Sequence, residues 1–188
     1  MRIIAGTFRG KKIFEPKDTL TRPLKDLAKE SIFNILNHSN KFDINLENSN
    51  ILDLFSGVGS FGIECLSRGA KYVVFAERYD GVLPMLRKNL QSLKSIENFE
   101  IIQQDIYNDK FFLNLNKKFE VIFMDPPYRD KNLSLLLDII KNEKILKENG
   151  ILIIHRHKDE KDIIPNKLNI IEEKKYGLSK IIFLSILS

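Results

Sequence analysis

The chain of 188 residues contains a single cysteine, Cys65, which excludes an internal disulfide framework. A protein without disulfides is typical of a reducing compartment. No apolar run approaches the roughly 20 residues that a membrane-spanning helix needs. The first residues, Met1–Gly6, also lack the long apolar core of a signal peptide. We therefore expect a cytoplasmic protein that does not act at a membrane.

Histidine is also scarce, with three residues in the chain. Two of them, His155 and His157, follow the apolar run Ile151–Ile154, and we expect surface or strand-end residues there. No group of His and Cys has the spacing of metal ligands. The sequence therefore predicts no metal site.

A hydrophobic content of 43% suffices for one domain with a substantial core. The net charge is +5, and residues 1–31 account for +4 of it, with eight Lys or Arg against four acidic residues. A basic surplus at one end is typical of proteins that bind polyanions such as nucleic acids. On charge alone, a solvated lysine-rich surface is the simpler explanation.

The amino-terminal 40 residues predict a short β-hairpin followed by a helix. The β-like runs Arg2–Ala5 and Lys11–Phe14 flank a glycine-bounded loop. Thr21-Arg22-Pro23 is typical of a helix start, and apolar residues then repeat at helical spacing from Leu24 to Leu36. Residues 37–50 are polar and predict a linker.

From Ile51 onward, continuously apolar runs alternate with amphipathic segments, which predicts a parallel sheet covered by helices on both faces. The predicted strands are Ile51–Phe55, Tyr72–Ala76, Phe99–Gln103, Phe119–Met124 and Ile151–Ile154, with helices over Val82–Leu93 and Leu133–Ile140. The last two runs, Leu168–Ile171 and Lys180–Leu187, are joined around Tyr176-Gly177 without a helix. They predict an antiparallel hairpin that closes the sheet edge. The fold class is therefore α/β, Rossmann-like and mostly parallel.

A glycine pattern, Gly57-Val-Gly59-Ser-Phe-Gly62, directly follows the first predicted strand of the sheet and opens a helix. Such glycines allow a tight turn and the close approach of a ligand to the helix amino end. Glu77 ends the second predicted strand, where an acid accepts hydrogen bonds from ribose hydroxyls. Strand, glycines, helix and acid together predict a nucleoside cofactor.

Four acids point to the type of nucleoside. Asp53, Glu77, Asp105 and Asp125 are all predicted at the carboxyl ends of strands. An acidic rim would repel a pyrophosphate and suit a cationic ligand such as S-adenosylmethionine, with Asp105 near the adenine ring. For Asp53 and Asp105, a turn or helix-cap role is the alternative.

The tetrapeptide Asp125-Pro126-Pro127-Tyr128 follows the predicted strand Phe119–Met124, at the edge where open α/β sheets bind ligands. A carboxylate, a rigid backbone that offers carbonyls, and an aromatic face together suit the exocyclic amino group of a planar base. A strand-ending turn, which Asp and Pro-Pro both favour, is the alternative.

These motifs resemble those of the class I S-adenosylmethionine-dependent methyltransferases that act on amino nitrogens. Further segments resemble the bacterial RsmD family, and they are Arg2-Ile-Ile-Ala-Gly6, Arg9-Gly10, Thr21-Arg22-Pro23, Glu30-Ser-Ile-Phe33-Asn-Ile-Leu36, Leu66-Ser-Arg-Gly-Ala70 and Tyr176-Gly177. The resemblance implies methylation of guanine N2 in 16S ribosomal RNA. We expect the RNA to be bound within a small-subunit assembly particle, with free RNA as the alternative, and we expect a monomer because nothing in the sequence demands a dimer. One position departs from the family, since His155 stands where it has an acid near the end of the fifth strand.

The resemblance also implies roles for residues. Asp125 and the carbonyl of Pro126 would accept the N–H groups of the base, Pro127 would keep the turn rigid, and Tyr128 would stack on the base. The implied cofactor set is Asp53, Phe55, Gly57, Gly59, Gly62, Glu77, Asp105 and Ile106. The implied phosphate set is Arg2, Arg9, Lys11, Lys12 and Arg22. Residues 1–40 would form an RNA-binding extension, and residues 41–188 the methyltransferase domain of one compact unit.

Other functions remain open from the residues. The same tetrapeptide serves adenine-N6 methyltransferases on DNA or RNA, although the chain has no room for a large DNA-recognition region. A protein glutamine methyltransferase typically has Asn in place of Asp125. A NAD-dependent oxidoreductase would leave the tetrapeptide without a role, and a non-catalytic RNA-binding module would leave the acidic rim without one.

Overall fold

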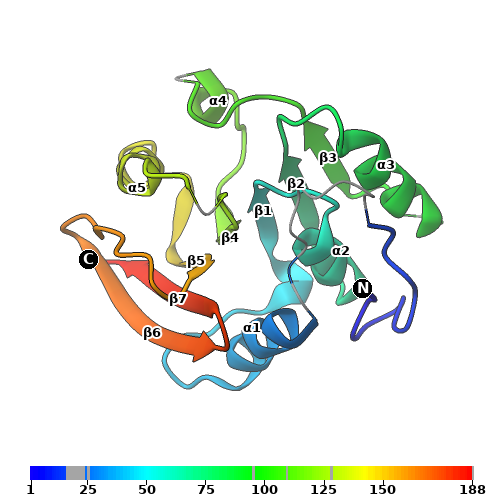
Figure 1. Cartoon of the computed structure of the whole chain (residues 1–188), viewed down its shortest axis with the longest axis horizontal. Helices are drawn as coiled ribbons and strands as arrows, with labels where there is room; N and C mark the ends of the chain where they lie inside the picture. The colour runs from blue at the N-terminus through cyan, green and yellow to red at the C-terminus, as the bar shows by residue number, and fades with distance from the viewer. Residues whose placement is uncertain (16–23, 25, 95, 109, 128, 188) are drawn as a thin grey trace.

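The computed structural model describes residues 1–15, 24, 26–94, 96–108, 110–127 and 129–187 (Figure 1). Its helices are α1 (Asp26–His38), η1 (Leu46–Asn48), α2 (Ser60–Ser67), α3 (Leu83–Ser92), α4 (Lys110–Leu113) and α5 (Leu133–Asn142). Its strands are β1 (Asn50–Leu54), β2 (Tyr72–Ala76), β3 (Phe99–Ile102), β4 (Phe119–Met124), β5 (Leu146–His157), β6 (Leu168–Tyr176) and β7 (Ser179–Ile186). Among these residues, no helix is long and apolar enough to cross a membrane.

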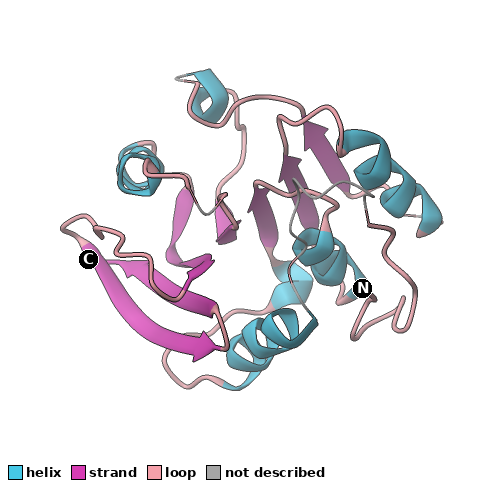
Figure 2. Cartoon of the chain, viewed as in Figure 1, coloured by secondary structure: helices cyan, strands magenta, loops and turns pink. Residues whose placement is uncertain are grey.

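The strands form one sheet with the order β3-β2-β1-β4-β5-β7-β6, a central layer between the helices in Figure 2. β3 to β5 run parallel, and β7 is antiparallel to both β5 and β6. The chain order reverses between β1 and β4, which are neighbours in the sheet. In open α/β sheets, ligands bind at the carboxyl ends of the strands beside such a switch point.

Side chains along each strand point alternately to the two faces of the sheet, so the core forms two clusters, one on each face. On one face, Ile51, Phe75 and Phe123 pack with α1, α2 and α3. On the other face, Leu52, Ile122 and other strand residues pack with α4 and α5. Both faces are therefore buried, which explains why the central strands are continuously apolar.

The predicted α/β class, with helices on both faces and a carboxyl-terminal antiparallel pair, is confirmed. The sequence did not predict the order of this pair, in which β7 inserts between β5 and β6 and leaves β6 at the edge. β5 is also longer than the predicted run Ile151–Ile154, since it begins at Leu146, continues through exposed polar residues and ends at His157.

The amino-terminal segment is antiparallel, as predicted, but it forms a single bridge between Arg2 and Lys12 instead of two strands. The amide of Ile3 donates to the carbonyl of Lys11 at 2.9 Å, and the amide of Ile13 donates to that of Met1 at 3.0 Å. The helix start predicted at Thr21-Arg22-Pro23 lies outside the described residues. The polar linker contains the short helix η1.

Candidate active site

The residues at the carboxyl ends of four strands lie in register. Asp53 of β1 pairs with Phe75 of β2 and Phe123 of β4, and Phe123 pairs with Ile153 of β5. Glu77, Asp125 and His155 each lie two residues beyond one of these partners. The register thus gathers acids that lie far apart in the sequence at one edge of the sheet.

The three glycines of the pattern have different roles, and the third, Gly62, lies in the first turn of α2. Gly57 and Gly59 have φ of +55° and +82°, which favour glycine. A Cβ atom on Gly62 would lie 2.3 Å from the ring of Phe75, so this glycine lets α2 pack on β2. A Cβ on Gly57 would instead have no described atom within 4 Å. The backbone is therefore tightly packed at Gly62 in α2 and open at Gly57 in the loop.

Ser56 adds an observation that fits a ligand beside this loop. Its side-chain oxygen is buried and has no hydrogen-bond partner among the described residues. Buried polar atoms in native proteins usually have a partner. The preceding residue, Phe55, has a φ of +58°, a strained conformation for a residue other than glycine.

Asp53 lies beneath the glycine loop with 1% of its surface exposed. Its Oδ2 accepts a hydrogen bond from the amide of Gly62 at 2.9 Å, which caps the amino end of α2. Burial raises the pKa of this carboxyl well above its usual range, and Asp125 and Glu77 raise it further against the effect of the Gly62 amide. Asp53 therefore makes the contact of a helix cap, which was the alternative to a role at the cofactor. The negative charges of Asp125 and Glu77 nearby still favour a cationic ligand.

Glu77 directly follows β2 and holds the glycine loop. Its Oε2 accepts from the amide of Gly57 at 2.8 Å, and its Oε1 accepts from that of Tyr79 at 2.8 Å. A carboxylate has about four acceptor positions. The side chain therefore retains capacity for the ribose hydroxyls that the sequence predicts as its partners.

Asp105 follows β3 and lies beside Arg78, whose Nη1 donates to Oδ2 at 2.6 Å. The amide of Tyr107 donates to Oδ1 at 3.0 Å. Burial alone would raise the pKa of Asp105, but these two hydrogen bonds and the charge of Arg78 outweigh it and lower that pKa. The predicted cofactor residue Ile106 is buried, and the rings of Phe55 and Tyr107 lie 6.2 Å apart, which joins this loop to the end of β1.

Asp125 immediately follows β4, and its Oδ1 lies 2.8 Å from Nδ1 of His155. Of the two environments expected for His155, a surface or a strand end, the structure shows the second, since it lies near the end of β5 with only 8% of its side chain exposed. The reason is the insertion of β7, which covers β5 and brings Ser179 within 2.9 Å of Nε2 of His155. Sequence reasoning assigned no role to this histidine.

The backbone after Asp125 is held by Arg156, a buried residue that belongs to none of the predicted site motifs. Its Nη1 donates to the carbonyl of Pro127 at 3.1 Å and its Nη2 to that of Asp130 at 2.9 Å. The carboxylate of Asp162 pairs with the same guanidinium at 2.9 Å. The sequence signal for this role of Arg156 is its position in an apolar strand, because a charged side chain that is buried needs partners. Within the tetrapeptide, Pro126 is buried and Pro127 is exposed.

A second contact connects this turn to the loop after β3. The hydroxyl of Tyr107 donates to Oδ2 of Asp130 at 2.9 Å. Burial and this hydrogen bond both raise the pKa of Tyr107, so the phenol remains a donor at neutral pH. Tyr128 lies outside the described residues.

The predicted phosphate-binding residues differ in their surroundings. Arg2, Arg9 and Lys12 are exposed. Lys11 is half-buried, and its ammonium donates to the carbonyl of Ser92 at the end of α3, so it is partly structural. Arg22 lies outside the described residues.

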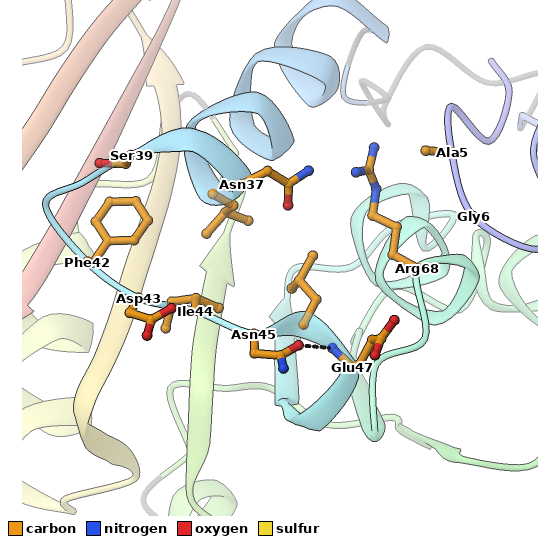
Figure 3. Close-up of a pocket in the computed structure, with 12 residues that line it drawn as sticks. Ala5, Gly6, Asn37, Ser39, Phe42, Asp43, Ile44, Asn45, Glu47 and Arg68 are labelled. Carbon is orange, nitrogen blue, oxygen red and sulfur yellow. Dashed lines mark hydrogen bonds between the residues drawn. The ribbon is translucent and has the colours of Figure 1, made fainter.

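A pocket elsewhere in the molecule contains none of the predicted site residues. It lies between the end of α1, the segment before β1 and Arg68 at the end of α2 (Figure 3). These elements meet at the amino ends of the strands, opposite the edge that carries Asp125. We therefore place the candidate active site at the carboxyl edge and not in this pocket.

Comparison with known proteins shows the family to which the chain belongs. The model of a family described as "Conserved hypothetical protein 95" matches residues 1–185. Two proteins named Ribosomal RNA small subunit methyltransferase D are similar in sequence. The one from Haemophilus influenzae is 35% identical over 95% of this chain and 90% of its own length. The one from Buchnera aphidicola is 31% identical over 92% and 86%.

Solved structures extend the similarity to the whole fold. A crystal structure from Haemophilus influenzae has a TM-score of 0.77 and 33% identity, and covers 100% of this chain and 99% of the other. A structure from Escherichia coli has a TM-score of 0.81 and 25% identity, and covers 100% and 98%. The matched sequence, the sheet order and the acids at its carboxyl edge lead to one conclusion: this chain belongs to the RsmD family.

Proposed function

We propose that this protein transfers a methyl group from S-adenosylmethionine to the exocyclic N2 of a guanine in 16S ribosomal RNA. The observation that carries the proposal is the position of Asp125, a carboxylate at the carboxyl end of β4 beside an acid-lined glycine loop. Relatives named for the methylation of small-subunit ribosomal RNA support the substrate class.

The residues of the loop fit the cofactor. S-adenosylmethionine, when bound, supplies an electrophilic methyl group on a positively charged sulfur. The negative surroundings of Asp53 favour such a cation, because a positive charge nearby offsets the burial of that carboxyl. Gly57 leaves open space at the loop, and the hydroxyl of Ser56, which has no partner in the described part of the chain, offers a hydrogen bond. Glu77 would accept from the ribose, and Asp105 with Ile106 would lie at the adenine.

The chain's own contribution to the reaction is to position the amine. The lone pair of guanine N2 is delocalised into the ring, so this nitrogen is a poor nucleophile. Asp125 and the carbonyl of Pro126 would each accept one N–H, which aims the lone pair out of the plane of the base. Positioning of this kind can lower a barrier by roughly 7–11 kcal/mol in favourable intramolecular reactions.

The carboxylate of Asp125 also stabilises the positive charge that develops on nitrogen as the new bond forms. The methylated nitrogen is strongly acidic, so it loses its proton to water without a strong base. The base has to leave its stack to reach this edge of the sheet, so the substrate is a flipped or unpaired guanine.

Finer features of the function are part of the same proposal. Residues 1–40 would serve as the RNA-binding extension, and the exposed side chains of Arg2, Arg9 and Lys12 support this role. We further infer that a cytoplasmic monomer acts on RNA within a small-subunit assembly particle.

The test is methyl transfer to 16S RNA, free or in small subunits, prepared from cells that lack this protein. Labelled S-adenosylmethionine is supplied, and the modified nucleoside is identified by mass spectrometry. We expect N2-methylguanosine. N6-methyladenosine would support the adenine-directed alternative, and the absence of label from both forms of the RNA would contradict the proposal.

A further inference from the structure

Three side chains from three neighbouring segments form one row of hydrogen bonds at the candidate active site. Asp125 Oδ1 lies 2.8 Å from His155 Nδ1, and His155 Nε2 lies 2.9 Å from the hydroxyl of Ser179. The imidazole is nearly buried, whereas 19% of the Asp125 side chain is exposed. The buried imidazole therefore lies between two half-buried side chains, one of which is the carboxylate at the edge of the sheet.

The chemistry of the groups fixes the direction of these bonds. An ionised carboxylate only accepts, so Nδ1 of His155 carries the proton that it donates to Asp125. In a neutral ring, Nε2 is then the acceptor, and the hydroxyl of Ser179 donates to it. The tautomer of His155 is thus set from both sides, by Asp125 and by Ser179.

The surroundings explain why a donor is needed at this position. The negative charge of Asp125 is close enough to Asp53 to contribute to the raised pKa of the latter. Repulsion between like charges disfavours this position of Asp125, and a hydrogen-bond donor to its carboxylate offsets that cost. His155 supplies a hydrogen bond without adding a further negative charge, as an acid at position 155 would.

The next residue of β5 acts on the opposite face of the sheet. Side chains alternate along a strand, so His155 and Arg156 point to opposite faces. His155 holds the carboxylate of Asp125, while Arg156 holds the carbonyls of Pro127 and Asp130. Two consecutive residues of one strand therefore fix both the side chain and the backbone of the turn after β4.

We propose that His155 is a positioning residue for Asp125, held in its Nδ1–H tautomer by Ser179. Because His155 occupies Oδ1, Oδ2 is the oxygen that Asp125 presents to the substrate amine. This inference deepens the proposed function and rests on it. It assigns a role to the position at which the chain departs from the expected acid.

Two substitutions of His155 separate positioning from packing. The amide nitrogen of Asn lies near the place of Nδ1, whereas that of Gln lies near the place of Nε2. His155→Asn thus keeps a donor to Asp125 and removes the hydrogen bond with Ser179, and His155→Gln does the reverse. Both variants replace a ring by an amide, so each serves as the packing control of the other.

We expect His155→Gln to lower kcat for methyl transfer by about 10- to 100-fold, the scale for residues that orient a reacting group. KM for both substrates should stay within about threefold of the wild type. His155→Asn should retain kcat within about threefold. Wild-type kcat in His155→Gln, or an equal loss of kcat in both variants, would overturn the proposal.

A second measurement needs neither RNA nor cofactor. Nitrogen NMR of ¹⁵N-histidine-labelled protein distinguishes the two neutral tautomers, and His155→Asn identifies the signal of His155. We expect the Nδ1–H tautomer in the wild type and its loss in Asp125→Ala. An Nε2–H tautomer in the wild type would overturn the proposal. Failure of the wild type to methylate RNA would instead contradict the proposed function.

Discussion

At the scale of single residues, Asp53 combines a structural contact with an electrostatic cost. Its carboxyl is buried, caps α2 through the amide of Gly62, and has a raised pKa because of burial and of the charges of Asp125 and Glu77. The folded state therefore binds the proton of Asp53 more tightly than the unfolded state does. Stability from this group is present at low pH and is lost as pH rises from the ordinary carboxyl range through the raised pKa.

The direction of this pKa shift gives a prediction for Asp53→Asn. The amide oxygen still accepts from Gly62, but the buried charge is gone. We expect the free energy of unfolding at neutral pH to rise by about 1–3 kcal/mol, the common scale of single substitutions. The gain should shrink as pH falls toward the ordinary carboxyl range, as measured by urea denaturation at several pH values.

Calorimetry with S-adenosylmethionine provides the functional counterpart. If Asp53 favours the cationic cofactor, Asp53→Asn should weaken its binding by about 10-fold, or about 1.4 kcal/mol. A more stable variant with wild-type affinity would show that Asp53 is only a helix cap. A less stable variant would contradict the expected sign of the pKa effect.

Residue roles that depend on local motifs could be predicted from the sequence, and those that depend on strand order could not. The glycines, Glu77 and Asp125 were all expected at this edge of the sheet, and the register places them there. His155 and Arg156 gain their partners only because β5 lies beside β4 and β7. Nothing in the spacing along the chain indicates that Ser179 reaches His155.

At the scale of elements, Glu64 of α2 binds the amino-terminal segment through hydrogen bonds. It is buried and accepts from the amides of Ile4 at 2.8 Å and Ala5 at 2.9 Å. Lys29 of α1 lies 3.5 Å from it, and Nε of Arg68 donates to it at 3.0 Å. Burial lowers the pKa of Lys29, while Glu64 acts in the opposite direction.

Removal of this carboxylate should therefore destabilise the fold. We expect Glu64→Ala to lower the free energy of unfolding by about 3–5 kcal/mol, because it removes the carboxylate that pairs with the buried charge of Lys29. Glu64→Gln keeps an acceptor for the backbone amides and should cost less, about 1–3 kcal/mol. Denaturant unfolding measures both, and equal effects of the two variants would show that the charge has no role.

Elements with a clear hydrophobic period were predictable. The strands β2 and β4 have the predicted bounds, and α3 and α5 differ from the prediction by two residues or fewer at each end. α4 and η1 are short and have no periodic pattern, so the sequence did not reveal them. The order of β6 and β7 was also missed, because an adjacent pair of strands can add to a sheet edge by either member.

At the scale of the whole molecule, the basic amino-terminal segment leads to the cofactor loop. Gly6 approaches the carbonyl of Ser67 so closely that a Cβ atom would lie 1.8 Å from it. Further along, Asn89 of α3 exchanges hydrogen bonds with the backbone of Phe14 and donates to the carbonyl of Val58 in the glycine loop. The segment thus runs along α2 from the amino edge of the sheet to the candidate site.

If RNA binds along the amino-terminal segment, the salt dependence of its affinity should depend on the basic side chains of that segment. We expect the paired substitutions Arg9→Gln and Lys12→Gln to weaken RNA binding. They should also reduce the slope of log K against log salt by about 0.7–0.9 for each phosphate that the protein no longer neutralises. Titrations at several salt concentrations measure this slope.

A matched control removes the same charge at the opposite edge. Lys118 and Lys144 are exposed and lie before β4 and after α5, at the amino ends of the strands. Lys118→Gln with Lys144→Gln should leave the slope unchanged. Equal slopes for the two double variants would mean that the amino-terminal segment has no specific part in RNA binding.

Asp125 is the residue on which the proposed reaction depends most, because its carboxylate is proposed to hold the amine that receives the methyl group. The most direct measurement is single-turnover methyl transfer to the RNA by Asp125→Ala, together with the affinity of this variant for S-adenosylmethionine. We predict a reduction of transfer of about 100- to 1,000-fold, the scale for one preorganised polar group, with cofactor affinity nearly unchanged. An equal reduction of both would make Asp125 a structural residue, and undiminished transfer would contradict the proposed mechanism.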